Sequence, residues 1–336
     1  MSTNTPYPPF RPHPLVVGGH LQTIFGAWIT GTQKTREISI RRHIELDDGD
    51  QLVLMDDFPA SRWKDGDPVA VLLHGLGGSA ESPHIRRIAH KLREQGIRTF
   101  RLNLRGCGAG EGLSKNLYHA GRSEDLQSAM EVIPRLCPGS QVFLAGFSLG
   151  GNIVLKWLGE HSETAVSLVD RAIAVNPPVD LGACTAAVQR RAFGFYDRYF
   201  AKMMFRQLCN SFDKSLIANA IDAPRRIICF DEAFTAPRSG FRSAAHYYDA
   251  CSAAPYISRI NVPTMILSAE DDPLIPAKIL HDLERPSAVQ LHIAESGGHL
   301  GYFGCTGDDP DRWWADWRVI DWFTRESTEA RLKFAA

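Results

Sequence analysis

The chain has 336 residues, enough for one large domain or two ordinary ones, and it is 44% hydrophobic and 22% charged with a formal net charge of -1. This balance gives no reason to expect nucleic acid or an anionic membrane as a partner, and no run of about 18 apolar residues could span a bilayer. Seven scattered cysteines without metal-ligand spacing, and an N-terminus without a signal-peptide core, predict a cytoplasmic protein with reduced thiols and no metal.

Strands and helices alternate along the first half of the chain. The first 35 residues are irregular, and two β-like runs around DDGD then predict a hairpin over residues 36–46 and 51–58. Apolar runs predict strands at 68–75, 97–104, 141–147 and 170–177, and helical spacing predicts helices at 82–96, 123–136 and 150–161. Such repeats are typical of a mostly parallel, twisted sheet with helices on both faces.

The alternation stops between residues 177 and 259, where the sequence is helical. It resumes with a strand at 262–271, a helix at 276–284, a strand at 288–296 and a helix at 313–323. We therefore predict a helical cap, 177–259, inserted between two parts of an α/β core, 36–176 and 260–336, after an irregular N-terminal segment, 1–35.

The stretch VFLAGFSLGGNIVLKWL runs from a strand directly into a helix, and Gly146, Ser148 and Gly150 form a G-x-S-x-G pattern at the junction. A turn this sharp needs small neighbours and holds the serine hydroxyl above the sheet, at a helix N-terminus that favours an oxyanion. The strand-to-helix context favours a nucleophile over a purely structural glycine turn. The sequence therefore predicts Ser148 as the catalytic nucleophile.

A serine nucleophile needs a base, and His299 follows the last predicted strand in the glycine-rich loop ESGGHLGYF. His292 lies within that strand, where its neighbours Leu291 and Ile293 take the opposite face, and it is predicted to be a surface or packing residue. His74 precedes the serine, which is the wrong chain order for this architecture. We expect His299 to be the base.

The base needs a carboxylate that fixes its tautomer. Glu270, Asp271 and Asp272 end the strand before it. Asp272 begins the turn that Pro273 enforces, so we select Asp272 and keep Asp271 as the alternative. The order serine, aspartate, histidine is that of α/β-hydrolases.

The oxyanion hole is predicted from two backbone N–H groups, those of Leu149, directly after the nucleophile, and of Leu76 in HGLGG. A phosphate-binding loop is the competing interpretation of HGLGGS. The loop lacks the lysine and the spacing of a P-loop, and it is not G-x-G-x-x-G.

Motifs along most of the chain resemble one family: FRPHPLVVGGHLQTI, HGLGGSAESPHIRRIAHKL, RLNLRGCGAGEG, YHAGRSEDL, GFSLGGNIVLKWLGE, SAEDDPLIP and GGHLGY. The chain resembles the YheT-like family of α/β-hydrolases, also called type 4 of the AB hydrolase superfamily. The resemblance implies the α/β-hydrolase fold with a triad at Ser148, Asp272 and His299. It also implies a carboxylesterase, with relatives that act on medium-chain acyl esters, including phospholipids, or transfer acyl groups to alcohols.

Other features admit two interpretations. His20, in GGHLQT (18–23), is expected to be a structural tether, and Cys107 a packing thiol rather than a second nucleophile. His119 and Asp125 are expected to order a loop and a helix start.

The cap residues Tyr196, Tyr199, Phe200, Met203 and Leu208 lie at helical spacing. They predict a packed helix, part of whose apolar face could line an acyl-chain pocket. The tryptophans near the C-terminus predict a helix packed on the sheet rather than membrane contact.

The sequence thus predicts a serine esterase without metal or organic cofactor, acting on a small-molecule acyl ester. Acyl transfer to an alcohol, lipase or phospholipase activity, and a binding protein with an idle triad are the alternatives.

Overall fold

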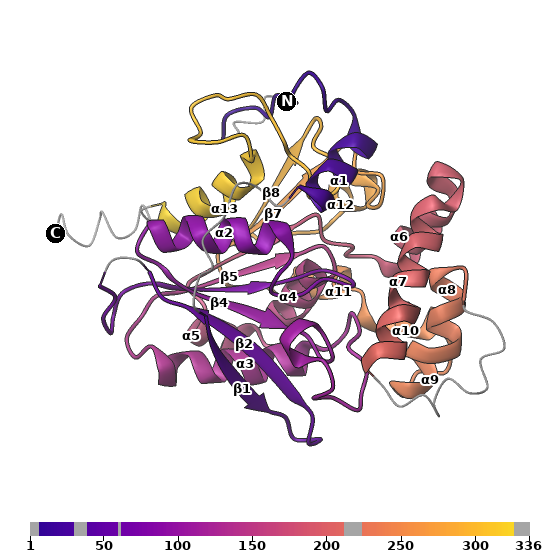
Figure 1. Ribbon diagram of the computed structural model, residues 1–336, viewed down its shortest axis with the longest axis horizontal. Coiled ribbons are helices and arrows are strands. Elements are labelled where there is room, and N and C mark those ends of the chain that lie inside the picture. The colour runs from indigo at the N-terminus through magenta and orange to yellow at the C-terminus, as the bar shows by residue number, and fades with distance from the viewer. Residues whose placement is uncertain (1–6, 30–38, 60–61, 212–223, 326–336) are drawn as a thin grey trace.

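The computed structural model describes residues 7–29, 39–59, 62–211 and 224–325 (Figure 1). One sheet runs through this part of the chain in the order β1-β2-β4-β3-β5-β6-β7-β8. Its antiparallel edge is β1 (Ile40–Glu45), β2 (Gln51–Asp57) and β4 (Arg98–Asn103), and all other neighbours pair parallel. The remaining strands are β3 (Val69–Leu73), β5 (Val142–Phe147), β6 (Arg171–Val175), β7 (Thr264–Ala269) and β8 (Val289–Ala294).

Helices cover both faces of this sheet, because its central strands are apolar on both sides (Figure 1). On one face lie α2 (Pro83–Glu94) and α13 (Trp314–Thr324); on the other lie α3 (Ser123–Leu136), α4 (Leu149–Glu160) and α5 (Ser162–Leu168). The short elements η1 (Gly108–Gly110) and α12 (Ala277–His281) lie in connections. The expected mostly parallel α/β sheet is confirmed.

Between β6 and β7 the described chain is helical, with no strand (Figure 1). This segment, which we call the cap, contains α6 (Leu181–Arg190), η2 (Arg191–Gly194), α7 (Phe195–Ser211), α8 (Ile227–Phe230), η4 (Asp231–Thr235), α9 (Ala236–Arg238), α10 (Ala244–Cys251) and α11 (Ala254–Ile257). These helices lie within the predicted limits 177–259. The division of the chain at residues 35, 176 and 259 remains a prediction.

The expectation of an irregular N-terminal segment was wrong for α1 (Gly19–Trp28). No side chain caps this helix and no acidic residue lies in its first turn, so it carries no local start signal. It forms against the loop of His299: Gln22 donates to the carbonyl of Phe303 at 3.0 Å and accepts from its N–H at 2.8 Å. Tertiary contacts therefore decide this helix.

The C-terminal helix packs as predicted. Trp313, Trp314 and Trp322 are buried, and the Trp322 indole donates to the carbonyl of Ala172 in β6 at 2.7 Å. Among the described residues, no helix is long and apolar enough to cross a membrane.

Candidate active site

The predicted nucleophile lies at a strained corner. Ser148 has φ 52° and ψ -120°, between the end of β5 and the start of α4. Such a backbone conformation is costly for a residue with a side chain and is concentrated at functional sites. The corner also needs Gly150, because a Cβ there would lie 2.5 Å from the carbonyl oxygens of Leu73 and His74. Gly150 of the G-x-S-x-G pattern is therefore required because the backbone there packs closely against the end of β3.

Three side chains from distant segments form one hydrogen-bonded chain. His299 Nε2 lies 2.8 Å from Ser148 Oγ, and His299 Nδ1 lies 2.8 Å from Asp272 Oδ2. With Nδ1–H donating to the carboxylate, Nε2 is left as the acceptor for the serine hydroxyl. The arrangement can remove a proton from Ser148 and hold the imidazolium that results.

Asp272, not Asp271, reaches the histidine. Its Oδ1 accepts the backbone N–H groups of Leu274 (2.7 Å) and Ile275 (3.0 Å), and it is 1% exposed. Asn176 donates to its Oδ2 at 2.7 Å. These donors orient the carboxylate toward the imidazole.

Asp271 has a different role: its Oδ1 accepts the backbone N–H of Gly298 at 2.8 Å. Both carboxylates therefore hold the histidine loop: Asp272 contacts the His299 side chain, and Asp271 contacts the backbone of Gly298.

Helix α1 supports the same loop. Thr23 Oγ1 accepts the backbone N–H of His299 at 2.9 Å and donates to the carbonyl of Gly19 at 2.6 Å. Gly19 must be glycine, because a Cβ there would lie 1.8 Å from the carbonyl oxygen of Asp271. His20 reaches the cap, where its Nδ1 lies 3.0 Å from the Tyr196 hydroxyl and the two rings stack. The predicted tether is confirmed, and it joins α1 to α7.

The two predicted oxyanion donors lie beside the serine. Leu76, Leu149, Ser148 and His299 line the same cavity. Within the described part of the chain, neither leucine N–H has an acceptor. Both amides are therefore available to a bound oxygen.

The competing histidines have structural contacts. His74 is fully buried, donates from Nδ1 to the carbonyl of Gly75 at 2.8 Å and accepts the N–H of Leu104 at Nε2. Burial lowers the pKa of His74 to about 4, so its ring is neutral. His292 packs between the rings of Tyr7 and Trp314, as expected of a packing residue.

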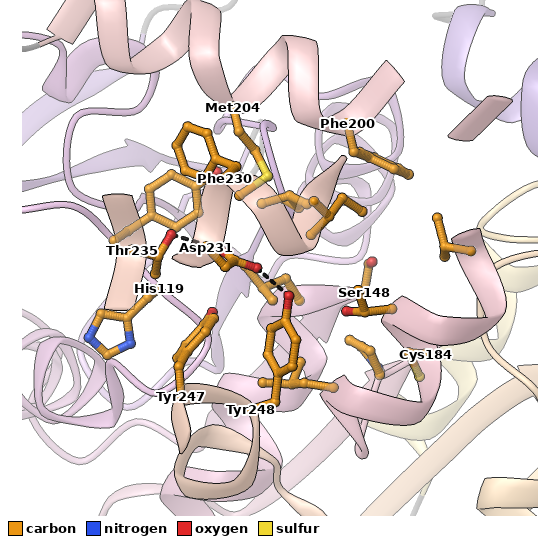
Figure 2. Close-up of a pocket in the computed structure, with 18 of the residues that line it drawn as sticks. His119, Ser148, Cys184, Phe200, Met204, Phe230, Asp231, Thr235, Tyr247 and Tyr248 are labelled. Carbon is orange, nitrogen blue, oxygen red and sulfur yellow. Dashed lines mark hydrogen bonds between the residues drawn. The ribbon is translucent and has the colours of Figure 1, made fainter. Parts of the chain in front are cut away.

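An apolar cavity of about 1000 Å³, including its part open to solvent, extends from Ser148 into the cap (Figure 2). Most of its wall is aliphatic, aromatic or sulfur-bearing, including Val188, Phe200, Met204, Leu208, Ile227 and Phe230. A second cavity, between α1 and α7, also reaches Ser148 and is lined by Trp28, Tyr196, Tyr199 and Met203. The helix predicted at 196–208 therefore contributes side chains to both cavities.

Other singled-out residues are structural. Cys107 is buried, its sulfur accepts from Gln207 at 2.9 Å, and burial raises the pKa of the thiol to about 12. The predicted packing thiol is confirmed. Asp125 forms a two-point ion pair with Arg105 at 2.7 and 2.6 Å. His119 accepts the N–H of Gly121, and burial lowers its pKa to about 3.

Sequence reasoning missed three residues that shape the site. Thr23 lay in a motif without an assigned role, Asn176 follows β6 with φ 49°, and Asp231 lines the cavity from the cap. A polar residue directly after a parallel strand is a usable signal for Asn176, since the ends of such strands meet at one edge. No comparable signal marks Thr23 or Asp231. Among the described residues no cluster of three His, Cys, Asp or Glu side chains could hold a metal.

The fold and this hydrogen-bonded serine, histidine and aspartate define the α/β-hydrolase class. A sequence model of the "Alpha/beta hydrolase family" matches residues 70–317. "Putative esterase YheT" of Escherichia coli (strain K12) is 31% identical over 291 residues, covering 84% of this chain and 84% of that protein. The chain therefore belongs to the alpha/beta hydrolase family, and its expected resemblance to the YheT-like group is confirmed.

Further relatives agree. "Monoacylglycerol lipase" of Saccharomyces cerevisiae is 27% identical, covering 82% of this chain and 64% of that protein. The solved structure of an esterase from Pyrococcus furiosus matches with a TM-score of 0.58 at 18% identity, covering 95% of this chain and 98% of that one, a likeness of fold. The chain is thus an α/β-hydrolase of the esterase and lipase type.

Proposed function

We propose that the protein is a serine hydrolase that cleaves short- to medium-chain acyl esters through an acyl-enzyme on Ser148. The observation that carries this proposal is the hydrogen-bonded chain of Ser148, His299 and Asp272 at the mouth of an apolar cavity. The names of the relatives, esterase and monoacylglycerol lipase, support a small-molecule ester as the substrate and a carboxylic ester hydrolase as the enzyme class.

The geometry suggests how each group acts. Ser148 Oγ attacks the ester carbonyl carbon while His299 Nε2 takes the hydroxyl proton. The N–H groups of Leu76 and Leu149 stabilise the oxyanion of the tetrahedral intermediate. His299 then protonates the leaving alcohol, and afterwards it activates a water molecule that hydrolyses the acyl-enzyme. Asp272 stabilises the imidazolium throughout.

These steps use side chains and backbone groups of the chain itself and call for no metal or organic cofactor. The acyl chain is placed in the cavity beneath the cap, where apolar side chains replace water around its methylene groups. We propose a cytoplasmic location, consistent with free cysteines throughout the described residues.

The test is labelling by a fluorophosphonate probe, followed by hydrolysis of p-nitrophenyl esters from acetate to laurate. Ser148→Ala should abolish labelling and lower kcat by about 10⁴-fold or more, and His299→Ala should cost about as much. Labelling that persists in Ser148→Ala would refute the nucleophile. A folded wild type that neither labels nor hydrolyses any ester would favour a binding protein.

The choice of acid has its own matched pair. Asp272→Asn should lower kcat by about 10⁴-fold, because the amide favours the wrong histidine tautomer. Asp271→Asn should retain most activity, since an amide oxygen can still accept the N–H of Gly298. Equal losses in the two variants would contradict this assignment.

A second candidate, acyl transfer to an alcohol, is favoured by one relative. "Medium-chain fatty acid ethyl ester synthase/esterase 2" of Saccharomyces cerevisiae is 25% identical, and its name joins synthesis to hydrolysis. The acyl-enzyme would then pass to an alcohol in place of water. Product analysis in the presence of ethanol separates the two, because ethyl ester formation would exceed free acid only for a transferase. The relative named "Phospholipase ABHD3" makes phospholipids a further substrate class to include in the assay.

A further inference from the structure

Three polar side chains meet within the apolar cavity that adjoins Ser148. Asp231 and Thr235 come from η4, and Tyr248 comes from α10 (Figure 2). Thr235 donates its hydroxyl to Asp231 Oδ1 at 2.7 Å, and Tyr248 donates its hydroxyl to Asp231 Oδ2 at 2.7 Å. We call these three residues the Asp231 cluster. It places a carboxyl group in a wall that is otherwise mainly apolar.

The carboxyl of Asp231 is buried, and no cation among the described residues compensates its charge. It is 3% exposed, and it forms no ion pair with any described residue. Arg105, which also lines the cavity, pairs with Asp48, Asp50 and Asp125. Burial raises the pKa of Asp231 to about 6. At neutral pH this pKa leaves the carboxyl mostly ionised, with no pairing cation among the residues that the structure describes.

The carboxylate has capacity left for a ligand. Each of its oxygens holds one hydroxyl hydrogen, and an ionised carboxylate oxygen can accept two. The rest of the cavity wall suits methylene groups, since most of it is formed by leucine, isoleucine, valine, methionine and aromatic side chains. A ligand that fits this wall has an apolar stem anchored at Ser148 and a hydrogen-bond donor at its far end.

We propose that the Asp231 cluster binds a hydroxyl group carried by the acyl chain of the substrate, with the hydroxyl donating to Asp231. This inference rests on the proposed function and names its substrate class: hydroxylated acyl esters. A plain acyl chain would leave the buried carboxylate facing a methyl group, and a site built for a hydrogen bond discriminates strongly against ligands that lack it. Binding an ammonium group there would carry a larger desolvation cost than binding a hydroxyl group, because the charged group must lose its hydration shell on entering the cavity.

A purely structural role is the alternative, in which Asp231 only fastens η4 to α10. A neutral side chain could make that contact without the cost of burying a charge. The two roles differ in substrate preference, so the decisive quantity is the ratio of kcat/KM for an ω-hydroxyacyl ester to that for the plain ester of equal length. A fastening role leaves this ratio unchanged, whatever it does to stability.

The experiment measures this ratio with p-nitrophenyl butyrate, hexanoate, octanoate and decanoate and their ω-hydroxy counterparts. In the wild type this ratio should exceed about ten for the acyl chain whose ω-hydroxyl reaches the Asp231 cluster. Asp231→Leu should lower it by about 10- to 100-fold, losing rate on the hydroxy ester and gaining it on the plain one. Asp231→Asn, which keeps one oxygen acceptor but no charge, should lower it by about tenfold and serves if Asp231→Leu does not fold.

The matched control is Asp197→Asn, because Asp197 is also a buried cap carboxyl, accepts the N–H of Ile227 at 2.7 Å and does not line the cavity. Its ratio should equal that of the wild type. A wild-type ratio of one or less at every length, or a ratio that Asp231 variants leave unchanged, overturns the hydroxyl assignment while ester hydrolysis stands. An ω-amino ester that outperforms the ω-hydroxy ester also overturns it. Failure to hydrolyse any ester would instead refute the proposed function itself.

Discussion

The buried carboxyl of Asp231 makes stability depend on pH in a predictable direction. Burial raises its pKa from an ordinary 3.8 to about 6, so the folded state disfavours the ionised form. Keeping the carboxylate ionised then costs the folded state about 3 kcal/mol. Asp231→Asn removes this cost, because the amide does not titrate.

The sign follows from the two pKa values. The penalty is fully present above the folded value of about 6 and vanishes below the unfolded value of 3.8. The free energy of unfolding of Asp231→Asn, minus that of the wild type, should therefore rise by about 2–3 kcal/mol between about pH 4 and pH 8. Changes in the hydrogen bonds from Thr235 and Tyr248 shift this difference equally at every pH and leave its slope intact.

Urea unfolding, followed by circular dichroism across this pH range, measures the difference directly. Other titrating groups are common to both proteins and cancel in the subtraction. Asp231→Leu also lacks the carboxyl and must show the same slope, whatever its absolute stability. A difference that stays flat with pH would show that burial does not raise the pKa of Asp231 in the folded protein.

Three further predictions concern the scaffold of the site. Thr23→Val leaves the N–H of His299 buried without its acceptor, so kcat should fall about tenfold and the free energy of unfolding by about 1–3 kcal/mol. Thr23→Ser keeps the hydroxyl and should be close to wild type. Equal effects of the two substitutions would contradict the hydrogen-bond argument. Gly150→Ala should destabilise by about 3 kcal/mol in a thermal melt, because its Cβ would collide with two backbone carbonyls; an unchanged melting temperature would refute it. Iodoacetamide followed by mass spectrometry should modify the exposed Cys229 and spare Cys107, whose pKa burial raises to about 12; rapid modification of Cys107 in the folded protein would disagree.

Local signals predicted much of the fold. Continuous apolar runs gave the central strands, and helical spacing gave helices such as α2 and α3, because periodicity follows directly from the geometry of each element. The serine was found for the same reason, since a sharp strand-to-helix turn needs glycines at fixed positions beside it. Chain order then led to His299 and to the group of acids from Glu270 to Asp272.

Helix α1 could not be predicted in this way. Its start, at Gly18 and Gly19, has no capping side chain, and the glycines read as irregular chain. Gly19 is present because the helix approaches the backbone of Asp271 closely, and Gly18 because its φ of 86° disfavours any residue with a side chain. A requirement set by a distant partner leaves no periodic trace in the local sequence.

By itself the sequence determined the α/β class, the corner that holds Ser148 and the segments that supply an acid and a base, because each depends on neighbouring residues. The turn at Pro273 already favoured Asp272 over Asp271, and the tertiary structure places Asp272 against the imidazole. Only the tertiary structure decided that Thr23 supports His299 across 276 positions of chain. It alone also placed Asp231 in the cavity wall with Tyr248. Such contacts depend on how whole elements pack, and packing is settled by the shapes of surfaces that the chain brings together only on folding.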